Sequence, residues 1–302
     1  MKTYVCIDIG GTAIKHSLLN EKGRLLRQGK LPTQAHLGGP AILEKAVGIV
    51  RSYQRPQHQL LGICISTAGM VDTEKGEIFY SAPLIPNYIG TAYKKTMEET
   101  FGVPCEVEND VNCAGLAECI SGAAKDSALT LCLTVGTGIG GCAVIGKEVL
   151  HGFCNSACEI GYMHMGDSDF QTLGATSILV KKVATAKQEP AEQWHGYRIF
   201  EEAAKGDAVC TQAIDELIDT LGKGIANICY VLNPQMVVLG GGIMEQGEHL
   251  RVLIEDRVKH YLVPVMAERI RVEVARYKNG AGMRGAFYHF LKKHPSRKVI
   301  ID

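Results

Sequence analysis

Residues 3–20 read TYVCIDIGGTAIKHSLLN, in which two apolar segments flank a short glycine-rich turn. The segments 3–9 and 13–20 predict two strands, because apolar residues run through each and glycines separate them. Residues 24–33 (RLLRQGKLPT) predict a third strand after the turn EKG. The chain is therefore expected to begin as a β-meander around a glycine turn.

Helices and strands alternate after this meander, and the same plan then starts again. Residues 40–53 have helical apolar spacing, and QLLGICIS (59–66) predicts a core strand. The second start is ALTLCLTV (128–135), a predicted strand that leads into the glycine turn GTGIGG (136–141). The other predicted elements are helix 91–101, strand 105–109, helix 111–120, a hairpin around 145–147, helix 207–232, strand 236–242, a helix, strand 269–277 and helix 281–293.

The repeated plan predicts an α/β fold with two lobes of similar topology and a central cleft. The boundary is expected near Ser121–Asp126. An N-terminal lobe would cover residues 1–120, and helix 281–293 could pack back on it. A larger C-terminal lobe would cover residues 121–302.

The charge balance, the apolar stretches and the cysteines argue against several classes of protein. Lys+Arg and Asp+Glu are both 32 in 302 residues, which argues against a general attraction to nucleic acid or acidic membranes. The apolar run after Met1 begins at once and contains Asp8, unlike a secretory signal, and apolar stretches fall short of the ~20 residues of a membrane span. The eleven cysteines are scattered, mostly in apolar runs, as reduced thiols are. We expect a cytoplasmic protein whose partners are neither nucleic acid nor membrane.

Three glycine-rich turns lie at predicted strand ends. In DIGGT (8–12) backbone amides and Thr12 could approach an anion and Asp8 could hold Mg²⁺, although a tight turn alone would also explain the glycines. GTGIGG fits the dinucleotide pattern G-x-G-x-x-G, but a strand is expected after it instead of the required helix. The near-match to a P-loop at 141–147 is rejected as well, because it lies in a hairpin. With LGGGI (239–243), the three turns favour a nucleotide-binding cleft.

Three carboxylates lie in short polar segments. Asp110 follows a predicted strand and precedes a helix, so it is either an N-cap or a general base, with Asn109 beside it as a hydroxyl ligand. Glu159, in NSACEIGYM, is either an ion-pair or capping residue or a ligand. Asp72 is predicted to be a turn residue.

Taken together, the motifs resemble the ROK family of sugar kinases and repressors, within the actin-like ATPase superfamily (ribonuclease H-like fold). The resemblance is collinear over nearly the whole chain. No helix-turn-helix of the repressor members precedes the first strand, which favours a kinase. The matching segments are DIGGTAIK (8–15), STAGMVD (66–72), ENDVNCAGLAE (108–118), GTGIGG (136–141), CEIGYM (158–163), LGGGI (239–243) and NGAGMRGAFYHF (279–290).

The resemblance implies roles for individual residues. Asp110 would deprotonate the sugar hydroxyl, and the N-terminal lobe would carry the sugar and phosphate loops while the C-terminal lobe binds the nucleotide. It also implies ATP with Mg²⁺, the ion held by Asp8, and a homodimer. The implied sugar ligands are Asn109, Asp110, Glu159, Tyr162, Gln171, Gly69 and Asn87. The implied ATP ligands are Asp8, Gly10, Gly11, Thr12, Lys15, Thr137, Gly138, Gly240 and Gly241.

Two departures from the family pattern concern zinc and the sugar. Tyr162 stands where family members often have a zinc-binding histidine, and no cysteine follows in the next segment, so no structural zinc is predicted. The E-x-G-Y form is similar to bacterial β-glucoside kinases and some N-acetylmannosamine kinases. Gln171 stands where a second sugar-binding glutamate is common. The substrate therefore stays open.

The expected function is the ATP-dependent phosphorylation of a hexose or hexose derivative at its 6-hydroxyl. Closure of the lobes would exclude water, which would otherwise accept the phosphoryl group. Two alternatives are a non-catalytic sugar-sensing regulator that keeps the fold and an ATPase that acts on another protein.

Overall fold

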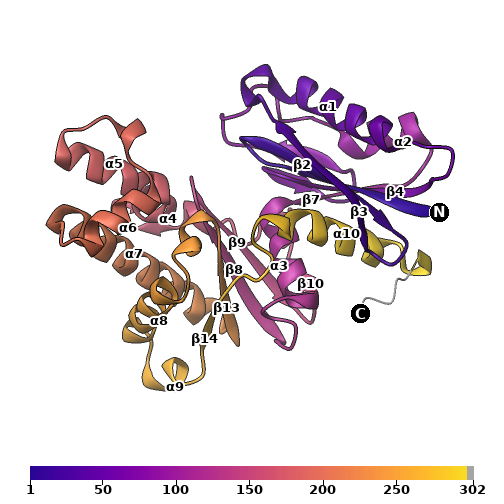
Figure 1. Cartoon of the computed structure of the whole chain (residues 1–302). Coiled ribbons are helices and arrows are strands. Elements are labelled where there is room, and N and C mark those ends of the chain that lie inside the picture. Colours follow the sequence, from indigo (N-terminus) through magenta and orange to yellow (C-terminus); the bar gives the residue numbers. More distant parts are fainter. Residues whose placement is uncertain (298–302) are drawn as a thin grey trace. The chain divides into compact units, whose positions relative to one another are not determined.

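The structure is a computed structural model that describes residues 1–297, and the chain divides into two compact units (Figure 1). Unit 1 combines Met1–Ile120, His151–Ala157 and the residues from Asn279 onward, and unit 2 combines Ser121–Leu150 with Cys158–Lys278. The sequence did not indicate that His151–Ala157 belongs with the N-terminal lobe. Unit 1 also takes the C-terminal helix, and the two units are similar in length. Residues 298–302 of the predicted second domain lie outside the described residues.

The core of unit 1 is a five-stranded sheet in the order β3-β2-β1-β4-β7. The first three strands form the antiparallel meander that the sequence predicts, and β1, β4 and β7 run parallel. Their carboxyl ends therefore meet at one edge of the sheet. The strands are β1 Lys2–Ile9, β2 Ala13–Asn20, β3 Leu25–Pro32, β4 Gln59–Thr67 and β7 Cys105–Asn109, with a separate hairpin of β5 Met70–Asp72 and β6 Glu77–Tyr80.

Helices cover both faces of this sheet. In Figure 1, α1 and α2 lie on one face, whereas α10 lies on the other. The aromatic side chain of Tyr4 on β1 makes edge contacts with Phe287 and Phe290 of α10, at ring-centroid distances of 5.1 and 5.5 Å. The last helix of the chain thus packs on the first strand. The helices of unit 1 are α1 Gly38–Tyr53, α2 Tyr93–Phe101, α3 Asp110–Ser121 and α10 Ala281–Lys293.

Unit 2 repeats the sheet plan. Its order is β10-β9-β8-β13-β14, with an antiparallel group followed by parallel β8, β13 and β14. A strand follows the glycine turn at Gly136–Gly138, so the rejection of a dinucleotide fingerprint is confirmed. The strands are β8 Leu129–Val135, β9 Ile139–Ile145, β10 Glu148–Val149, β11 His164–Met165, β12 Ser168–Asp169, β13 Met236–Gly240 and β14 Arg271–Val274.

The long helix α7 organises the helical layer of unit 2. Its apolar stripe includes Leu217, Leu221 and Ile225, all buried in one hydrophobic cluster with the sheet. Asp207 caps its start by accepting a hydrogen bond from the Cys210 backbone N–H at 2.9 Å. Each unit has a hydrophobic core of its own. The helices are α4 Phe170–Gly174, α5 Thr176–Lys187, α6 Gly196–Ala204, α7 Ala208–Leu232, α8 Glu248–Tyr261 and α9 Pro264–Ala267.

Candidate active site

The predicted catalytic residues of unit 1 meet at the carboxyl ends of its parallel strands. Asp8, near the end of β1, is the register partner of Ser66 on β4, and Thr67 is the partner of Asn109 on β7. Ligands of α/β sheets bind outside this edge. The edge therefore collects the groups that the sequence assigned to phosphate and sugar.

Asp8 is held between a hydroxyl, an ammonium group and a helix start. Ser66 Oγ donates to Asp8 Oδ1 at 2.8 Å. Burial raises the pKa of Asp8, while Ser66 and the charge of Lys15, its partner across β2, act in the opposite direction. A Cβ atom at Gly282, in the first turn of α10, would lie 2.3 Å from Asp8 Oδ1. The carboxylate thus lies against a helix N-terminus, which favours its charged form.

The DIGGT turn does not need its glycines for backbone conformation. Neither Gly10 nor Gly11 has a positive φ, and no atom lies within 4 Å of a Cβ placed at Gly11. The turn is closed by a hydrogen bond from Gly10 N to Ala13 O at 3.1 Å and braced by Thr33 Oγ1, which donates to Gly10 O at 2.5 Å. Gly11 therefore leaves exposed backbone that a ligand can approach, whereas a Cβ at Gly10 would lie 3.3 Å from Ala13 O, so the tight turn still accounts for Gly10.

Asn109, and not Asp110, is the principal cap of α3. Asn109 Oδ1 accepts hydrogen bonds from the backbone N–H groups of Val111 and Asn112, at 2.8 and 3.0 Å. Asp110 is the first residue of the helix and accepts from Val111 N at 2.9 Å. The capping alternative considered for Asp110 therefore belongs to its neighbour, and the Asp110 carboxylate begins the helix at the strand edge.

Gly69 and Asn87 lie around the same edge. Asn109 Nδ2 donates to Gly69 O at 3.0 Å, and Gly69 has a φ of 93°, which favours glycine. Asn87 is exposed with a φ of 51°, and the next residue, Tyr88, hydrogen-bonds through its hydroxyl to Thr67. Burial raises the pKa of Tyr88, and the charge of Asp110 adds to the effect. Both predicted sugar residues are thus next to groups that contact the Asn109–Asp110 turn.

Asp72 is a turn residue, as predicted. Its Oδ1 accepts hydrogen bonds from the backbone N–H groups of Glu74 and Lys75 at 3.1 and 3.0 Å. The Lys75 backbone hydrogen bond is the main reason for the lowered pKa of Asp72. The carboxylate is therefore used locally, at the end of the β5 strand.

In unit 2, Gln171 lies over two of the predicted motifs. Its Oε1 would be 3.0 Å from a Cβ atom at Gly138 and 3.2 Å from one at Gly161. Gly138 belongs to the phosphate turn, which is closed by a hydrogen bond from Gly136 N to Gly138 O at 2.9 Å. Gly161 lies between Glu159 and Tyr162. Unit 2 thus brings the GTG turn, the CEIGY segment and Gln171 together.

Glu159 differs from the other acidic groups of unit 2. Its half-buried carboxylate has no hydrogen-bond or ion-pair partner among the described residues. Burial is the cause of its raised pKa. A carboxylate that burial leaves without a donor is prepared to accept one from a ligand. The ion-pair and capping alternatives for Glu159 are not supported.

The side chain of Tyr162, three residues after Glu159, is exposed, with 43% of its surface accessible. The nearest cysteines are Cys154, which is exposed, and Cys158, which is half-buried. Among residues 1–297 no group of three or more His, Cys, Asp or Glu side chains could hold a metal ion. The absence of a structural zinc stays a prediction.

A cavity of about 440 Å³ in unit 2 adjoins the GTG turn. The start of α5 is tied to this turn by hydrogen bonds from Thr176 N to Gly136 O and from Ser177 Oγ to Thr137 O, at 2.9 and 2.6 Å. Two buried polar atoms in its lining residues, Trp194 Nε1 and Thr176 Oγ1, have no hydrogen-bond partner among the described residues. The lining residues are Gly136, Thr137, Thr176, Ser177, Val180, Trp194, His195, Gly196, Tyr197, Gly242, Ile243, Glu245 and Gln246.

The glycines of LGGGI differ in their relation to this cavity. Gly242 lines it, whereas Gly240 is the buried last residue of β13. Gly241 has a φ of 89°, and a Cβ there would lie 2.3 Å from Val135 O, so this glycine is needed for packing. The lining residues 176–197 were missed because α5 has a weak amphipathic pattern and α6 is short; the single tryptophan of the chain was a further signal.

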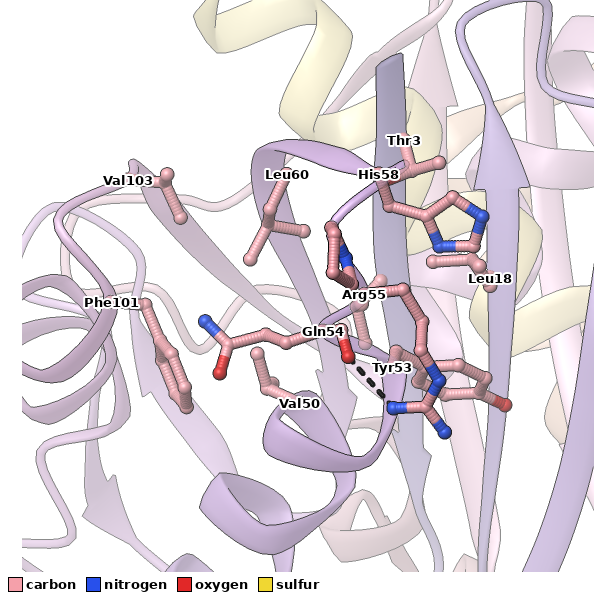
Figure 2. A pocket seen from close by; sticks show the side chains of 12 residues that line it. Thr3, Leu18, Val50, Tyr53, Gln54, Arg55, His58, Leu60, Phe101 and Val103 are labelled. Atoms are coloured by element: carbon pink, nitrogen blue, oxygen red, sulfur yellow. Dashed lines mark hydrogen bonds between the residues drawn. The ribbon is translucent and has the colours of Figure 1, made fainter. Parts of the chain in front are cut away.

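Unit 1 contains a second cavity of about 440 Å³, which Figure 2 shows. It lies at Thr3 and Leu60, near the amino ends of β1 and β4, where Arg55 donates to the backbone oxygen of Gln54 at 2.7 Å. Strand geometry separates Thr3 from Asp8 by about 16 Å. This cavity is therefore not part of the candidate active site.

Comparison with known proteins identifies the family. The family model described as "ROK family" matches residues 4–293. The chain belongs to the ROK family. A curated relative, the beta-glucoside kinase of Klebsiella pneumoniae, is 31% identical, with 94% of this ROK protein and 94% of the relative aligned.

Solved structures confirm the expected two-lobed actin-like ATPase fold class for this ROK chain. A Listeria monocytogenes protein described as a candidate N-acetylmannosamine kinase has a TM-score of 0.87 at 28% identity, covering 97% of this chain and 99% of that one. A ROK family glucokinase of Streptomyces griseus, in complex with glucose and AMPPNP, has a TM-score of 0.80 at 25% identity, covering 94% and 97%. Within residues 1–297, no helix is long and apolar enough to cross a membrane.

Proposed function

We propose that this ROK protein is an ATP-dependent kinase of a hexose or a hexose derivative, with Asp110 as its general base. The observation that carries the proposal is the place of Asp110. It begins α3 directly after β7, beside Asn109, at the strand edge that also holds Asp8 and the open glycine turn. Relatives named as sugar kinases, aligned over almost their whole length, support the same activity.

In the proposed reaction, Asp110 accepts the proton of the sugar's 6-hydroxyl as that oxygen bonds to the γ-phosphorus of ATP. The bond from the γ-phosphorus to the β–γ bridging oxygen breaks, and ADP leaves with its electron pair. A base in phosphoryl transfer needs correct placement more than an unusual pKa. The capped start of α3 supplies that placement, because Asn109 fixes the first turn from which Asp110 projects.

Asp8 suits the Mg²⁺ that accompanies ATP. Protein sites for this ion use one or two carboxylates and leave the other positions to water and phosphate oxygens. Asp8 offers such a carboxylate, with Ser66 as a hydrogen-bond donor and Lys15 opposite it. When bound, the ion would neutralise charge on the phosphates.

The cavity of unit 2 is proposed to hold the nucleotide. Its two buried unpaired polar atoms, Trp194 Nε1 and Thr176 Oγ1, offer hydrogen bonds that a nucleoside can complete. Thr137 and the start of α5 are proposed to lie near the phosphates, since helix N-termini attract anions. Gly242 keeps one wall open to a flat group, because no atom lies within 4 Å of a Cβ placed there.

Glu159 is proposed to bind sugar hydroxyls, with Gln171 beside it. Tyr162 replaces a histidine that is common in the family, and its exposed ring is a flat apolar surface. We propose that this surface tolerates a substituent or another epimer of glucose. A β-glucoside or N-acetylmannosamine would then be a better substrate than free glucose.

The activity is tested by following ADP release with a panel of sugars. We expect ADP release that requires one of glucose, a β-glucoside, N-acetylmannosamine, mannose or fructose. Glucose as the best substrate by a wide margin would contradict the role proposed for Tyr162. ADP release without any sugar would favour an ATPase acting on a protein, and sugar binding without turnover would favour a regulator.

The base is tested by Asp110→Asn, which keeps the side-chain volume and removes the proton acceptor. Turnover is expected to fall on the order of 10²- to 10⁴-fold, while sugar binding measured by calorimetry changes little. Turnover near that of the wild type would refute the assignment of Asp110. Asp72→Asn is the matched control, because Asp72 serves a surface turn, and it should keep full activity.

A further inference from the structure

A buried carboxylate that the proposed mechanism does not use lies directly behind the Asn109–Asp110 turn. Glu108, the residue before Asn109 on β7, has 1% of its surface accessible. Buried carboxylates are almost always paired, because an unpaired charge in the interior is costly. Three hydrogen-bonding groups surround this one, a second histidine lies 3.5 Å away, and all four belong to unit 1.

The two carboxylate oxygens of Glu108 have different partners. Oε1 accepts from the backbone N–H of Asn109 at 2.7 Å and from Asn112 Nδ2 at 3.0 Å. Oε2 lies 2.6 Å from His151 Nε2 and 3.5 Å from His289 Nδ1. One oxygen thus joins the strand end to the first turn of α3, on both sides of Asp110. The other oxygen is fixed mainly by His151.

His151 reaches this position because a short segment between two parts of unit 2 belongs to unit 1. The chain leaves unit 2 after Leu150, contributes His151–Ala157 to unit 1 and returns to unit 2 at Cys158. The segment His151–Ala157 is closed by a hydrogen bond from Ala157 N to His151 O at 3.1 Å. Thr73 Oγ1 also donates to Asn155 Oδ1 at 3.3 Å. His151 is therefore held by its own segment and does not depend on Glu108 for its place.

We infer that His151 is a positioning residue for catalysis: by holding Glu108 Oε2, it orients Oε1 onto the Asn109 N–H and so fixes the turn that presents Asp110. The inference rests on the proposed role of Asp110 as base. Rotation of the Glu108 carboxylate would release the Asn109 N–H and the Asn112 side chain together. A displacement of the base by about 1 Å can cost on the order of 10²-fold in rate.

The charges around Glu108 agree with this arrangement. Burial opposes ionisation of Glu108, but the hydrogen bond from His151 and the charges of both histidines lower its pKa. Burial lowers the pKa of His289, whose Nε2 has no partner among the described residues. His151 is therefore the stronger partner of the carboxylate. Other titratable groups near the cluster are Glu106, Lys293, Asp8, Asp110 and Cys113.

The same strand provides a matched control. Glu106, two residues before Glu108 on the same side of β7, is also buried and accepts from His294 Nε2 at 2.9 Å. The exposed fractions of the two histidine side chains are similar, 28% for His151 and 25% for His294. The Glu106 carboxylate accepts its hydrogen bonds from Lys94 and His294, and none of these bonds reaches the Asn109–Asp110 turn.

The test compares His151→Ala, His151→Gln and His294→Ala in the full chain, with the best sugar of the panel. His151→Ala should lower kcat about 30-fold, within the range expected for a displaced base, and leave KM for sugar and for ATP within about 3-fold of wild type. His294→Ala should keep kcat within about 2-fold, although both alanine variants lower the urea midpoint. His151→Gln should restore most of kcat, because its amide N–H replaces Nε2–H as donor to Glu108.

A second arm separates this inference from the role of Asp110. If His151 acts through Asp110, His151→Ala should cause little further loss of turnover in an Asp110→Asn background. Equal losses of kcat in His151→Ala and His294→Ala would overturn the inference while leaving the base assignment intact. Wild-type turnover in Asp110→Asn would instead reject the base and the inference together.

Discussion

At the scale of single residues, Glu159 shows how a ligand group can reduce stability. Its carboxylate is half-buried without a donor among the described residues, and burial raises its pKa. A carboxyl with a raised pKa in the folded state contributes stability below its unfolded pKa of about 4.5, and this contribution is lost as the pH rises through the folded pKa. Near neutral pH, where the carboxylate that we propose as a sugar ligand is charged, Glu159 opposes folding.

Glu159→Gln should therefore be more stable than the wild type near pH 8, and this difference should shrink toward pH 4. The same change should raise KM for the sugar about 10-fold, because a charged acceptor is replaced by a neutral one. Urea unfolding at the two pH values and sugar kinetics check both effects. A variant that is less stable at pH 8 would show that the carboxylate has a structural partner. Glu148→Gln, on the surface of β10, is the control.

The residues of the ENDVN segment show what the sequence could and could not predict locally. The sequence predicted that Asn109 and Asp110 lie at a strand-to-helix junction, because the apolar periodicity changes there from that of a strand to that of a helix. The division of roles was not predictable: either residue is a favoured cap, and only tertiary contacts such as that with Gly69 decide between them. Glu108 carries no local signal, because its partner His151 is 43 residues away.

At the scale of elements, α10 approaches its neighbours through two glycines. A Cβ atom at Gly285 would lie 1.8 Å from the backbone oxygen of Cys113 on α3, and one at Gly282 would lie 2.3 Å from Asp8 Oδ1. Spacing of three places both on one side of the helix. The glycines therefore set how closely α10 packs on α3 and on the end of β1.

Gly285→Ala should destabilise the protein by about 1–3 kcal/mol, because the added methyl group forces backbone atoms apart. Gly48→Ala is the matched control on α1, where no atom lies within 4 Å of the new Cβ. That change should stabilise by about 0.5–1 kcal/mol through helix propensity. Denaturant unfolding of both variants measures the difference. Equal effects in the two variants would mean that α10 can shift without cost.

The elements that the sequence predicted are those with long regular patterns. The meander, α1, α7 and the last helix have apolar runs or stripes that local physics can determine. The hairpin of β5 and β6, the two-residue strands β11 and β12 and the five-residue helix α4 are too short for a periodic signal. Their structure depends on contacts, as Gln171 on α4 shows by lying against Gly138 and Gly161.

At the scale of the whole molecule, the chain has two cores, and the proposed nucleotide cavity lies wholly in unit 2. Trp194, the single tryptophan of the chain, lines this cavity with its indole Nε1 unpaired in the described structure. Arg198 lies over its ring, 4.0 Å from the centroid. The oligomeric state, expected to be a homodimer, stays a prediction.

Trp194 should report nucleotide binding by its fluorescence. ADP or ATP should change the emission in a saturable way, and a nucleotide at about 100 times its Kd should stabilise the protein by roughly 2.7 kcal/mol. Val180→Phe, which fills the cavity wall, should abolish the change. A sugar-dependent ATPase whose emission did not respond to nucleotide would place the nucleotide elsewhere. Val231→Phe, at an exposed position on α7, is the control for the added ring.

The path of the chain between the units could be predicted only in part from the sequence. Helix 281–293 was expected to be able to pack back on the N-terminal lobe, although its periodicity does not say which sheet it covers, because both sheets offer an apolar face. Likewise, no pattern in HGFCNSA indicates that these residues leave one unit and join the other. Long-range pairings such as Tyr4 with Phe287 are decided by the fold as a whole.

The packing of α10 on β1 also has a consequence for how the protein is made. A ribosome releases β1 before Ala281–Lys293, so the nascent sheet of unit 1 lacks the cover of α10 until all of unit 2 has been synthesised. During that interval the face that later receives Phe287 and Phe290 is exposed around Tyr4. Unit 2 ends at Lys278, before α10 begins, so it can fold earlier than unit 1. Unit 1, which supplies β1, is thus completed only after unit 2.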